Sequence, residues 1–382
     1  MNIFNIGFIV IILAYSLLIL SYAYFFTKLK RNSLDYQIVN HIKVSIIIAA
    51  RNEAHCILTL LLSIKNQNYT SDSIEIIVVD DASTDDTFKT VEKFADQYPD
   101  FNCKIIRIEE DSIKPTYKKF AISKAILQSK GELIITTDAD CCVGPYWVSG
   151  IVNYYQQTKA KIMVGMVAYQ HDTSVFQKMQ HLEFLSLIAS GAAAVESGFP
   201  IMCNGANLIY ERKAFDEVNG FDSNVDYASG DDVFLLLKIK KHFGKESVFA
   251  LNDRNTIVYT EAKKTFPEFL HQRIRWASKT KGYKDVAILM VAGIIFLFNA
   301  CILFTFVLGI IQHEFLKLSL ILFIIKLIVD FPILFGITGF VNRKDLLLYF
   351  IPLQIIYLPY VLIIGTISNF VSYQWKGRKI DK

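Results

Sequence analysis

The chain has 382 residues, of which 53% are hydrophobic and 20% are charged, and its formal net charge is +4. The length leaves room for more than one structural unit, because domains average roughly 150 residues. The small charge, without a basic helix or an arginine-rich tract, excludes a nucleic-acid partner from our expectations. The six cysteines form no Cys-x-x-Cys pair, so we expect free thiols in a reducing compartment rather than a zinc site or disulfides.

The first predicted element is an apolar segment, residues 3–26, which exceeds the ~20 residues that span a bilayer. No basic residue precedes it and no small-residue cleavage pattern follows it, so we interpret it as an uncleaved transmembrane anchor. Lys28, Lys30 and Arg31 follow directly. The positive-inside rule then places the N-terminus outside and the central region in the cytoplasm. Residues 27–42 are expected to form a polar linker.

Apolar runs and helical patterns alternate in the next hundred residues. We expect strands over 43–50, 74–79, 103–108 and 131–138, separated by helices over 58–64, 88–97 and 118–129. This alternation predicts a mostly parallel sheet with helices on both faces. No Gly-x-Gly-x-x-Gly follows the first strand and no P-loop pattern occurs, which argues against a dinucleotide-binding domain and against a P-loop NTPase.

Three of these strands end in loops that carry acids: Arg51-Asn-Glu53, Asp80-Asp81 and Asp138-Ala-Asp140. The carboxyl ends of parallel strands are where ligands of such sheets bind. Asp138 and Asp140 are two residues apart, so in an extended segment they point to the same side. Two hard oxygen ligands suit a divalent cation shared with a phosphate, although two surface aspartates in a turn would give the same pattern.

The motifs that follow one another along the chain are segments 45–53, 78–87, 137–140, 203–215, 219–222 and 229–235 and Gln272-Arg-Ile-Arg275-Trp276. In the order of these motifs, over residues 43–281, the chain resembles a family 2 glycosyltransferase with a GT-A fold. The last segment matches the Gln-x-x-Arg-Trp pattern of membrane-bound members. The resemblance implies an α/β, mostly parallel GT-A domain over residues 43–282, flanked by transmembrane helices. It also implies an inverting, metal-dependent hexosyltransferase.

The resemblance assigns the donor site to the strand ends. Asp80 and Asp81 would contact the nucleoside of a nucleotide sugar, with UDP as the expected nucleotide, and Glu53 would line the same crevice. Asp140 would hold Mn²⁺ or Mg²⁺ directly, and Asp138 would contact the ribose or the metal. As an alternative, an acid after the second strand caps the next helix, which Ser83 or Asp85 could do equally well.

The resemblance places further donor and acceptor residues outside the strand ends. Lys118 matches a lysine near the donor, although residues 114–124 could equally be a solvated helix face. Asp232, which follows Asp231, matches the general base that takes the proton of the acceptor hydroxyl. Two acids before a helix also cap it, which is the alternative for both.

Gln272, Arg275 and Trp276 would share one helix face, with Pro267 in its first turn. An amide, a guanidinium and an indole on one face could bind the donor diphosphate and line the acceptor hydroxyl. A tryptophan close to a membrane segment also commonly lies at the interface, which explains Trp276 alone. Upstream, residues 176–199 form either an interfacial helix that a lipid-borne acceptor could approach or a plain buried helix.

Three more apolar segments close the chain, over residues 286–311, 316–341 and 346–370. Four spans would place the basic tail, residues 371–382, outside, against the positive-inside rule. Pro352 and Pro359 make the last segment the expected place for a re-entrant or broken helix. Lys326 and Asp330, at i and i+4, form either a self-neutralising pair or part of a polar ligand path.

We therefore predict a membrane-anchored glycosyltransferase that moves a sugar from a nucleotide sugar to a lipid or lipid-linked acceptor. The expected location is the bacterial inner membrane, with the catalytic domain in the cytoplasm. A processive polysaccharide synthase of the cellulose, chitin or hyaluronan type is the alternative within the class. A nucleotidyltransferase, for which only Arg51 offers a basic phosphate contact near the N-terminus, and a membrane transporter are more distant alternatives.

Overall fold

The computed structural model describes residues 3–30, 41–108, 117–222, 230–278, 285–368, 370–371, 373–375 and 378–380. It divides into two compact units, which we describe separately. The sheet unit comprises Leu29–His171 and Ala194–Glu261. The helical unit comprises Met1–Lys28, Asp172–Ala193 and Ala262–Lys382.

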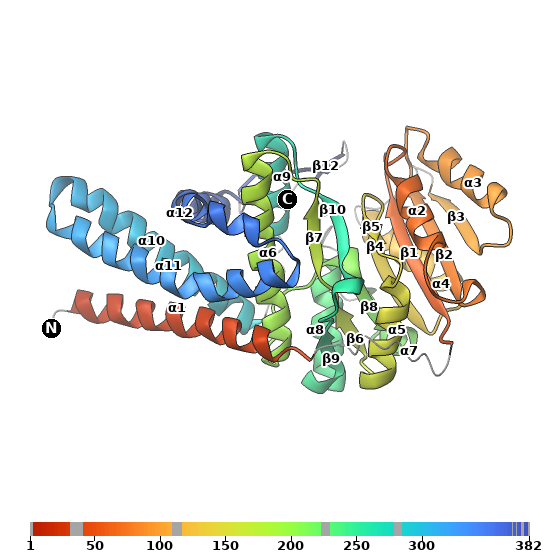
Figure 1. Cartoon of the computed structure of the whole chain (residues 1–382), viewed down its shortest axis with the longest axis horizontal. Helices are drawn as coiled ribbons and strands as arrows, with labels where there is room; N and C mark the ends of the chain where they lie inside the picture. Colours follow the sequence, from red (N-terminus) through yellow and green to blue (C-terminus); the bar gives the residue numbers. More distant parts are fainter. Residues whose placement is uncertain are drawn as a thin grey trace. The chain divides into compact units, whose positions relative to one another are not determined.

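A seven-stranded, mostly parallel sheet forms the core of the sheet unit, in the order β3-β2-β1-β4-β8-β6-β9 (Figure 1). The first four strands in the chain are parallel: β1 (Val44–Ala50), β2 (Ile74–Asp81), β3 (Cys103–Ile108) and β4 (Leu133–Asp138). Then β8 (Leu208–Glu211) runs antiparallel to β4 and to β6 (Ile162–Val164), and β9 (Val248–Ala250) runs parallel to β6. The α/β fold class predicted from the alternation is confirmed.

Helices connect these strands. The three predicted helices are confirmed as α2 (Ile57–Lys65), α3 (Thr87–Gln97) and α4 (Tyr117–Gln128). Later in the chain follow α5 (Trp147–Thr158), α7 (Arg212–Glu217) and α8 (Asp231–Phe243). Every residue of β2 is buried, as expected for a strand with helices on both faces. A small second sheet joins β5 (Cys142–Val143), β10 (Val258–Glu261) and β7 (Val167–Gln170), an arrangement that the sequence did not predict.

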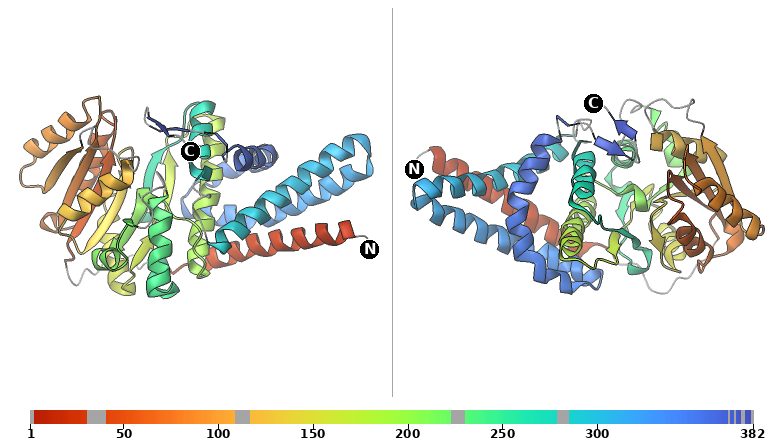
Figure 2. Two further views of the ribbon diagram at one scale, coloured as in Figure 1. Left: turned by 180° about the vertical axis from the view of Figure 1, so that it is seen from behind. Right: turned by 90° about the horizontal axis from the view of Figure 1, so that it is seen from above.

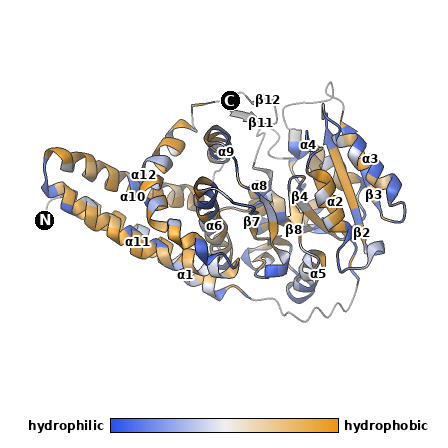
Figure 3. Cartoon of the chain, turned by 45° about the horizontal axis from the view of Figure 1, so that its top comes forward, coloured by the Kyte–Doolittle hydropathy of each residue, from blue (hydrophilic) through white to orange (hydrophobic). Residues whose placement is uncertain are grey.

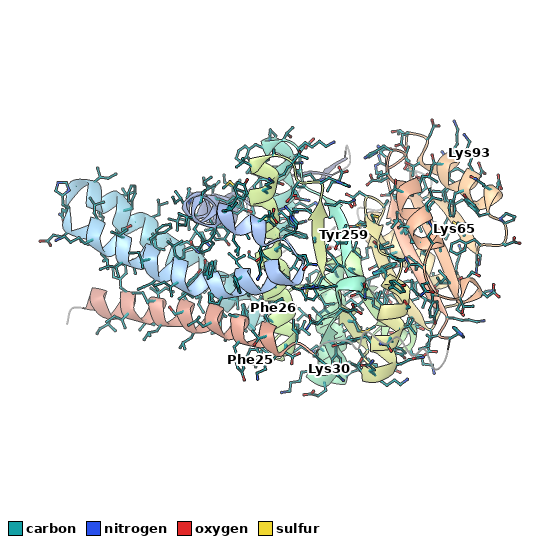
Figure 4. All side chains as sticks on the ribbon, in the orientation of Figure 1. Phe25, Phe26, Lys30, Lys65, Lys93 and Tyr259 are labelled. Atoms are coloured by element: carbon teal, nitrogen blue, oxygen red, sulfur yellow. The ribbon has the colours of Figure 1, made fainter. Side chains whose placement is uncertain are left out.

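Four helices are long and apolar enough to cross a membrane, at Ile6–Lys28, Val286–Ile311, Glu314–Phe340 and Lys344–Ile367. They correspond to α1 (Ile3–Lys28), α10 (Val286–Ile311), α11 (Glu314–Phe340) and the pair formed by a 3-10 helix, η8 (Lys344–Tyr349), and α12 (Phe350–Ile367). Figure 3 shows their predominantly hydrophobic colouring. In Figure 4, Phe25 and Phe26 mark the end of α1 and Lys30 follows beyond it.

Two further helices complete the helical unit, α6 (Val175–Glu196) and α9 (Phe266–Ser278), of which α6 continues beyond Ala193 into the sheet unit. A capping box begins α9, because Glu268 N–H donates to the Thr265 hydroxyl while Thr265 N–H donates to the Glu268 carboxylate. Pro267 lies in the first turn, as predicted. Two short strands, β11 (Tyr373–Trp375) and β12 (Arg378–Ile380), follow α12.

The pair Lys326 and Asp330 lies buried on one face of α11, with 2.6 Å between Nζ and Oδ2. Tyr15 of α1 donates its hydroxyl to the other carboxylate oxygen at 2.6 Å and accepts a hydrogen bond from Lys326 at 3.0 Å. The predicted pairing is therefore confirmed, and it also joins α1 to α11. A charge inside an apolar helix is tolerated when it is paired in this way.

A second polar cluster joins the start of α6 to the loop after α11. Both Nη atoms of Arg343 donate to Asp172, at 2.8 and 3.1 Å, and its Nε donates to Asp345 at 2.9 Å. His181 lies 2.8 Å from Asp172. Burial would raise the pKa of Asp172, but the hydrogen bonds from Arg343 and His181 outweigh it and lower that pKa. Burial lowers the pKa of His181 despite this carboxylate.

Candidate active site

The register of the sheet brings two of the predicted acids to the same edge. Asp80 pairs with Ala50, the last residue of β1, and Asp138 pairs with Ala49 on the other side of β1. The two aspartates therefore flank the carboxyl end of the central strand, which is where a ligand of a parallel sheet binds. The prediction that separate strand ends meet at one edge is confirmed for these two residues.

Asp80 is fully buried at the end of β2. Its Oδ1 accepts the backbone N–H of Ser83 at 3.3 Å, whereas its Oδ2 has no hydrogen-bond partner among the residues that the structure describes. Burial raises the pKa of Asp80, and the hydrogen bond from Ser83 offsets only part of that shift. A buried carboxylate oxygen without a partner costs stability, so a ligand donor is a physical explanation for its presence.

The loops after β1 and β2 hold one another in an uncommon backbone conformation. Asn52 and Ala82 both have positive φ, 54° and 49°. The Asn52 N–H donates to the Ser83 hydroxyl at 2.9 Å, and Arg51 donates to the carbonyl oxygens of Asp81 and Ala82 at 2.7 Å each. Strained positions of this kind persist where surrounding contacts fix them, often at ligand sites.

At the start of α3, Asp85 accepts the backbone hydrogen bond that the sequence alternative assigned to a capping acid after β2. Its Oδ1 accepts the N–H of Thr87, the first residue of α3, at 3.0 Å, and its Oδ2 accepts the N–H of Ala54 at 3.1 Å. Asp80 and Asp81 are therefore not needed as caps. Glu53, in the loop after β1, is also buried, and its N–H donates to the Thr87 hydroxyl at 2.8 Å.

Lys118, Asp138 and Asp232 meet around one glycine. Lys118 Nζ forms an ion pair with Asp138 Oδ1, and Gly205 N–H donates to Asp232 Oδ2 at 3.2 Å. A methyl group placed on Gly205 would lie 3.7 Å from Asp232 Oδ2 and 3.9 Å from Lys118 Nζ. The two charged groups are therefore neighbours across this glycine, and a solvated helix face does not describe Lys118.

Hydrogen bonds fix both sides of this cluster. The Thr136 hydroxyl on β4 donates to the Gly205 carbonyl at 2.8 Å, which ties the 3-10 turn η3 (Gly205–Asn207) to the strand that carries Asp138. Asp232 lies in the first turn of α8, and its Oδ1 accepts the N–H of Val233 at 2.9 Å. Asp231 is in the same turn, and its side chain lies outside the described residues.

Asp140 follows β4 in the turn that leads to β5, and its carboxylate is half-buried. Carboxylate oxygens are the ligands that Mg²⁺ and Mn²⁺ prefer, so the donor set of Asp138 and Asp140 fits such an ion. Asp138 already carries the charge of Lys118, which leaves Asp140 as the carboxylate better suited to bind a cation directly. Among the described residues, Glu53, His55 and Cys56 also bring donor atoms within 4.8 Å of one another, although this set mixes soft and hard donors.

The predicted Gln-x-x-Arg-Trp residues lie on α9, in the helical unit. Gln272 Oε1 accepts a hydrogen bond from Arg273 Nη1 at 2.6 Å. The ring of Trp276 lies 4.4 Å from the Arg273 guanidinium carbon and 5.7 Å from the Phe184 ring. Arg275 is in the last turn of the same helix.

Sequence reasoning missed three residues that support this motif, Arg273, Glu183 and Tyr360. Arg273 donates through Nε and Nη2 to Glu183 on α6, and both side chains are buried. The Tyr360 hydroxyl on α12 donates to the same carboxylate at 3.3 Å. The available signal was an acid, Glu183, in the middle of the apolar stretch 176–199, because a buried acid requires a partner. Similarly, Gly205 and Thr136 could not be connected before the fold was known.

The fold is therefore an α/β domain with a mostly parallel sheet, with acids at the carboxyl ends of β2 and β4 and an ion pair of Lys118 with Asp138 beside them. The chain belongs to the family 2 glycosyltransferases: the model "Glycosyl transferase family 2" matches residues 45–218, and "Glycosyl transferase family group 2" matches residues 133–372. The recognition made from the motifs is therefore confirmed at the level of the family.

The chain shares low sequence identity with its curated relatives. The chain is 24% identical over 244 residues to a beta-monoglucosyldiacylglycerol synthase of Synechocystis sp., which is 64% of this chain and 49% of that one. It is 27% identical over 241 residues to the probable glycosyltransferase YdaM of Bacillus subtilis, or 62% and 54% of the two chains. The chain thus spans about half the length of these relatives.

Among solved structures, the mannosyltransferase PcManGT from Pyrobaculum calidifontis, in complex with GDP-Man and Mn²⁺, matches 95% of this chain and 97% of its own. The TM-score is 0.59 at 17% identity. A likeness at this identity supports the fold, including the long apolar helices, and not a particular substrate.

Proposed function

We propose that this protein is an inverting, metal-dependent glycosyltransferase that transfers a hexose from a nucleotide sugar to a lipid or lipid-linked acceptor in a membrane. The observation that carries the proposal is the cluster of Lys118, Asp138 and Asp232 around Gly205, at the same sheet edge as the orphaned oxygen of Asp80. It supplies a nucleoside contact, charge compensation for a diphosphate and a base within one site.

The donor is held at the strand ends in this proposal. Asp80 Oδ2 accepts a hydrogen bond from the base or the ribose, and Asp81 and Glu53 line the same crevice. Asp140, with Asp138, holds Mn²⁺ or Mg²⁺. The ion, when bound, screens the diphosphate and stabilises the departing nucleotide. Gln272, Arg275 and Trp276 on α9 are proposed to bind the donor diphosphate and line the acceptor.

Asp232 acts as the general base. It accepts the proton of the acceptor hydroxyl as that oxygen attacks the anomeric carbon, while the bond from this carbon to the diphosphate oxygen breaks. The backbone N–H groups of Gly205 and Val233 hold both carboxylate oxygens of Asp232 in place. Lys118, its neighbour across Gly205, is proposed to compensate the negative charge that develops on the leaving diphosphate.

We propose a lipid acceptor because the Synechocystis relative is named for a glucosyldiacylglycerol product, a lipid. We propose UDP as the donor nucleotide from the resemblance of the motifs, whereas the PcManGT structure contains GDP-Man. The long apolar helices are compatible with a membrane protein, and we propose the bacterial inner membrane with the sheet unit in the cytoplasm. A processive synthase remains the second candidate, and mass spectrometry of the product length would distinguish the two.

The test is a screen of nucleotide sugars with the membrane-embedded protein and a membrane lipid extract, in which released nucleotide diphosphate is measured. We expect one donor to be consumed, with a requirement for Mn²⁺ or Mg²⁺. Asp140→Asn should reduce turnover at least about 100-fold, because one anionic ligand is lost. Asp96→Asn, an exposed aspartate on α3, is the matched control. Turnover that is unchanged in Asp140→Asn would refute the metal assignment, and a transporter would show no donor consumption.

A further inference from the structure

The last apolar helix, α12, is placed differently from the three helices beside it. In α1 and α11, Tyr15 donates to Asp330, and a methyl group on Gly336 would lie 3.3 Å from the Phe26 ring, so these two helices run in the same direction. In α10 and α11, the Ser319 hydroxyl donates to the Ile302 carbonyl at 3.1 Å, and the helices run antiparallel from the turn at 312–313. Figure 1 shows these three helices side by side.

The contacts of α12 show that it crosses α10 and α11 instead of running along them. At the start of α12, the ring centroids of Phe350 and Phe331 lie 5.6 Å apart. In its middle, the ring centroid of Tyr357 lies 5.1 Å from Lys326 Nζ. Near its end, a methyl group on Gly365 would lie 3.2 Å from the Phe296 ring. The antiparallel register places Phe296 about level with residue 325 of α11. While α12 advances about 22 Å from residue 350 to 365, its contacts advance only about 9 Å along α11. The right-hand view in Figure 2 shows this crossing.

The middle and end of α12 pack against α6 and α9, which are not among the long apolar helices. Tyr360 packs against Phe269 of α9, with ring centroids 5.6 Å apart, and donates to Glu183 of α6. Ile364 packs against Ile274 of α9. Because α9 carries charged and amide side chains along most of its length, it belongs at the polar boundary of the membrane.

The opposite side of α12 is an apolar stripe. Ile351, Ile355, Ile363 and Ile367 recur at multiples of four residues and are 38–56% exposed, whereas Phe350, Leu353 and Ile364 are buried. Exposed residues of α10 and α11 at similar levels, including Phe331 and Leu297, are equally apolar. The stripe thus continues the apolar surface of the neighbouring helices.

The depth of α12 fits the membrane boundary. Helix α11 is about 40 Å long, which exceeds the ~30 Å hydrocarbon core. With the turn at 312–313 at the far boundary, the contacts of α12 at residues 326–331 lie roughly 5–12 Å inside the near boundary. This is the depth at which helices parallel to a membrane surface bury their apolar face.

From these contacts we infer that α12 lies within the near leaflet, parallel to the membrane plane, and that its apolar stripe binds lipid acyl chains. The chain then crosses the membrane three times, and the tail returns to the side of Lys28 and α9. Strand β11 packs against α9. From Ile367 at the end of α12 to Tyr373, six residues extend about 22 Å at most, which is too short to recross the core.

The inference also resolves the charge conflict in the sequence. With three spans, the basic tail at residues 371–382 and the loop that carries Arg343 and Lys344 lie on the same side of the membrane as the basic residues after α1. All three groups then satisfy the positive-inside rule. The inference does not depend on the proposed glycosyl transfer, because it concerns the side of the membrane and not the reaction.

The test is labelling of the full-length protein with a membrane-impermeant maleimide in intact and in lysed cells. We compare Gln312→Cys in the far turn with Asp381→Cys in the tail, and Lys344→Cys serves as the near-side reference. We expect Gln312→Cys to gain label in intact cells, and the other two only after lysis. A green fluorescent protein fused to the C-terminus of the unaltered chain should fluoresce, which covers the case of a variant that does not fold.

The inference is overturned if Gln312→Cys and Asp381→Cys label under the same condition, because both sites would then lie on one side of the membrane. A dark C-terminal fusion that accumulates in the membrane would also contradict it. Neither readout measures donor turnover, so an inactive protein with this topology would refute only the proposed function.

Discussion

At the scale of single residues, Asp80 is the strongest sign of a ligand site, because its buried Oδ2 has no hydrogen-bond partner among the described residues. A fully buried carboxylate with one oxygen lacking a partner is unfavourable for the fold without a ligand. Its retention is understandable if the same oxygen binds a donor group of the nucleotide, because proteins tolerate destabilising groups at functional sites.

Asp80→Asn should therefore separate stability from binding. Because burial raises the pKa of Asp80, the folded protein retains a proton that the unfolded chain loses, and stability falls as the pH rises through the raised pKa. Above that pH, we expect Asp80→Asn to unfold at the same temperature as the wild type or higher. Donor affinity should fall about tenfold, since a hydrogen bond to a charged acceptor is lost. Thermal unfolding and donor titration measure the two effects.

The control for this prediction is Asp85→Asn in the next loop. Burial would raise the pKa of Asp85, but the hydrogen bonds from Thr87 and Ala54 outweigh it and lower that pKa. Its contribution to stability is present above the ordinary pKa and is lost as the pH falls. Asp85→Asn should therefore lower the unfolding temperature at neutral pH. If Asp80→Asn also lowers the unfolding temperature, the hypothesis that the buried Asp80 carboxylate destabilises the fold in the absence of a ligand is wrong.

At the scale of elements, the sequence predicted the four parallel strands β1 to β4 and the three helices between them closely, but not β6, β8 and β9 of the same sheet. The reason is local: β1, β2 and β4 are nearly continuous apolar runs, and the polar loops that follow mark where each strand ends. The positions of Asp80 and Asp138 at one edge then followed from parallel topology alone.

What the sequence did not predict depends on contacts between distant segments. Lys118 reaches Asp138 across 20 residues, and Arg273 reaches Glu183 across 90. Hydropathy also could not distinguish α12 from a span, because its direction depends on Tyr360 and Ile364 packing against α6 and α9 and not on composition. The small sheet of β5, β10 and β7 escaped prediction because its strands are only two to four residues long.

The buried ion pair of Glu183 on α6 with Arg273 on α9 should contribute to the stability of the helical unit. Arg273→Leu leaves the Glu183 carboxylate buried without its cation, which should cost about 3–5 kcal/mol. The double variant Glu183→Leu with Arg273→Leu should cost less than Arg273→Leu alone, since no charge remains buried. Thermal unfolding of the full chain in detergent measures both. Equal losses in the single and the double variant would show that the pair contributes no specific coupling.

At the scale of the whole molecule, the chain combines a sheet unit that carries Asp80 and Asp138 with a helical unit that carries the Gln272–Trp276 motif. Within the helical unit, Arg343 pairs with Asp172 just before α6, and Glu183 of α6 accepts a hydrogen bond from Tyr360 of α12. Under the proposed function, the sheet unit takes the soluble donor and the unit with the long apolar helices takes the membrane-bound acceptor.

The most direct test of the account is the effect of Asp232→Asn on donor binding and on turnover, measured on the same preparation. General-base catalysis contributes about 10²–10⁴-fold, so turnover should fall by at least 100-fold while donor affinity stays within a factor of about three. Asp216→Asn, an exposed aspartate on α7, should retain wild-type turnover. If Asp232→Asn transfers the sugar at a rate within twofold of the wild type, the assignment of the base and the proposed mechanism are wrong.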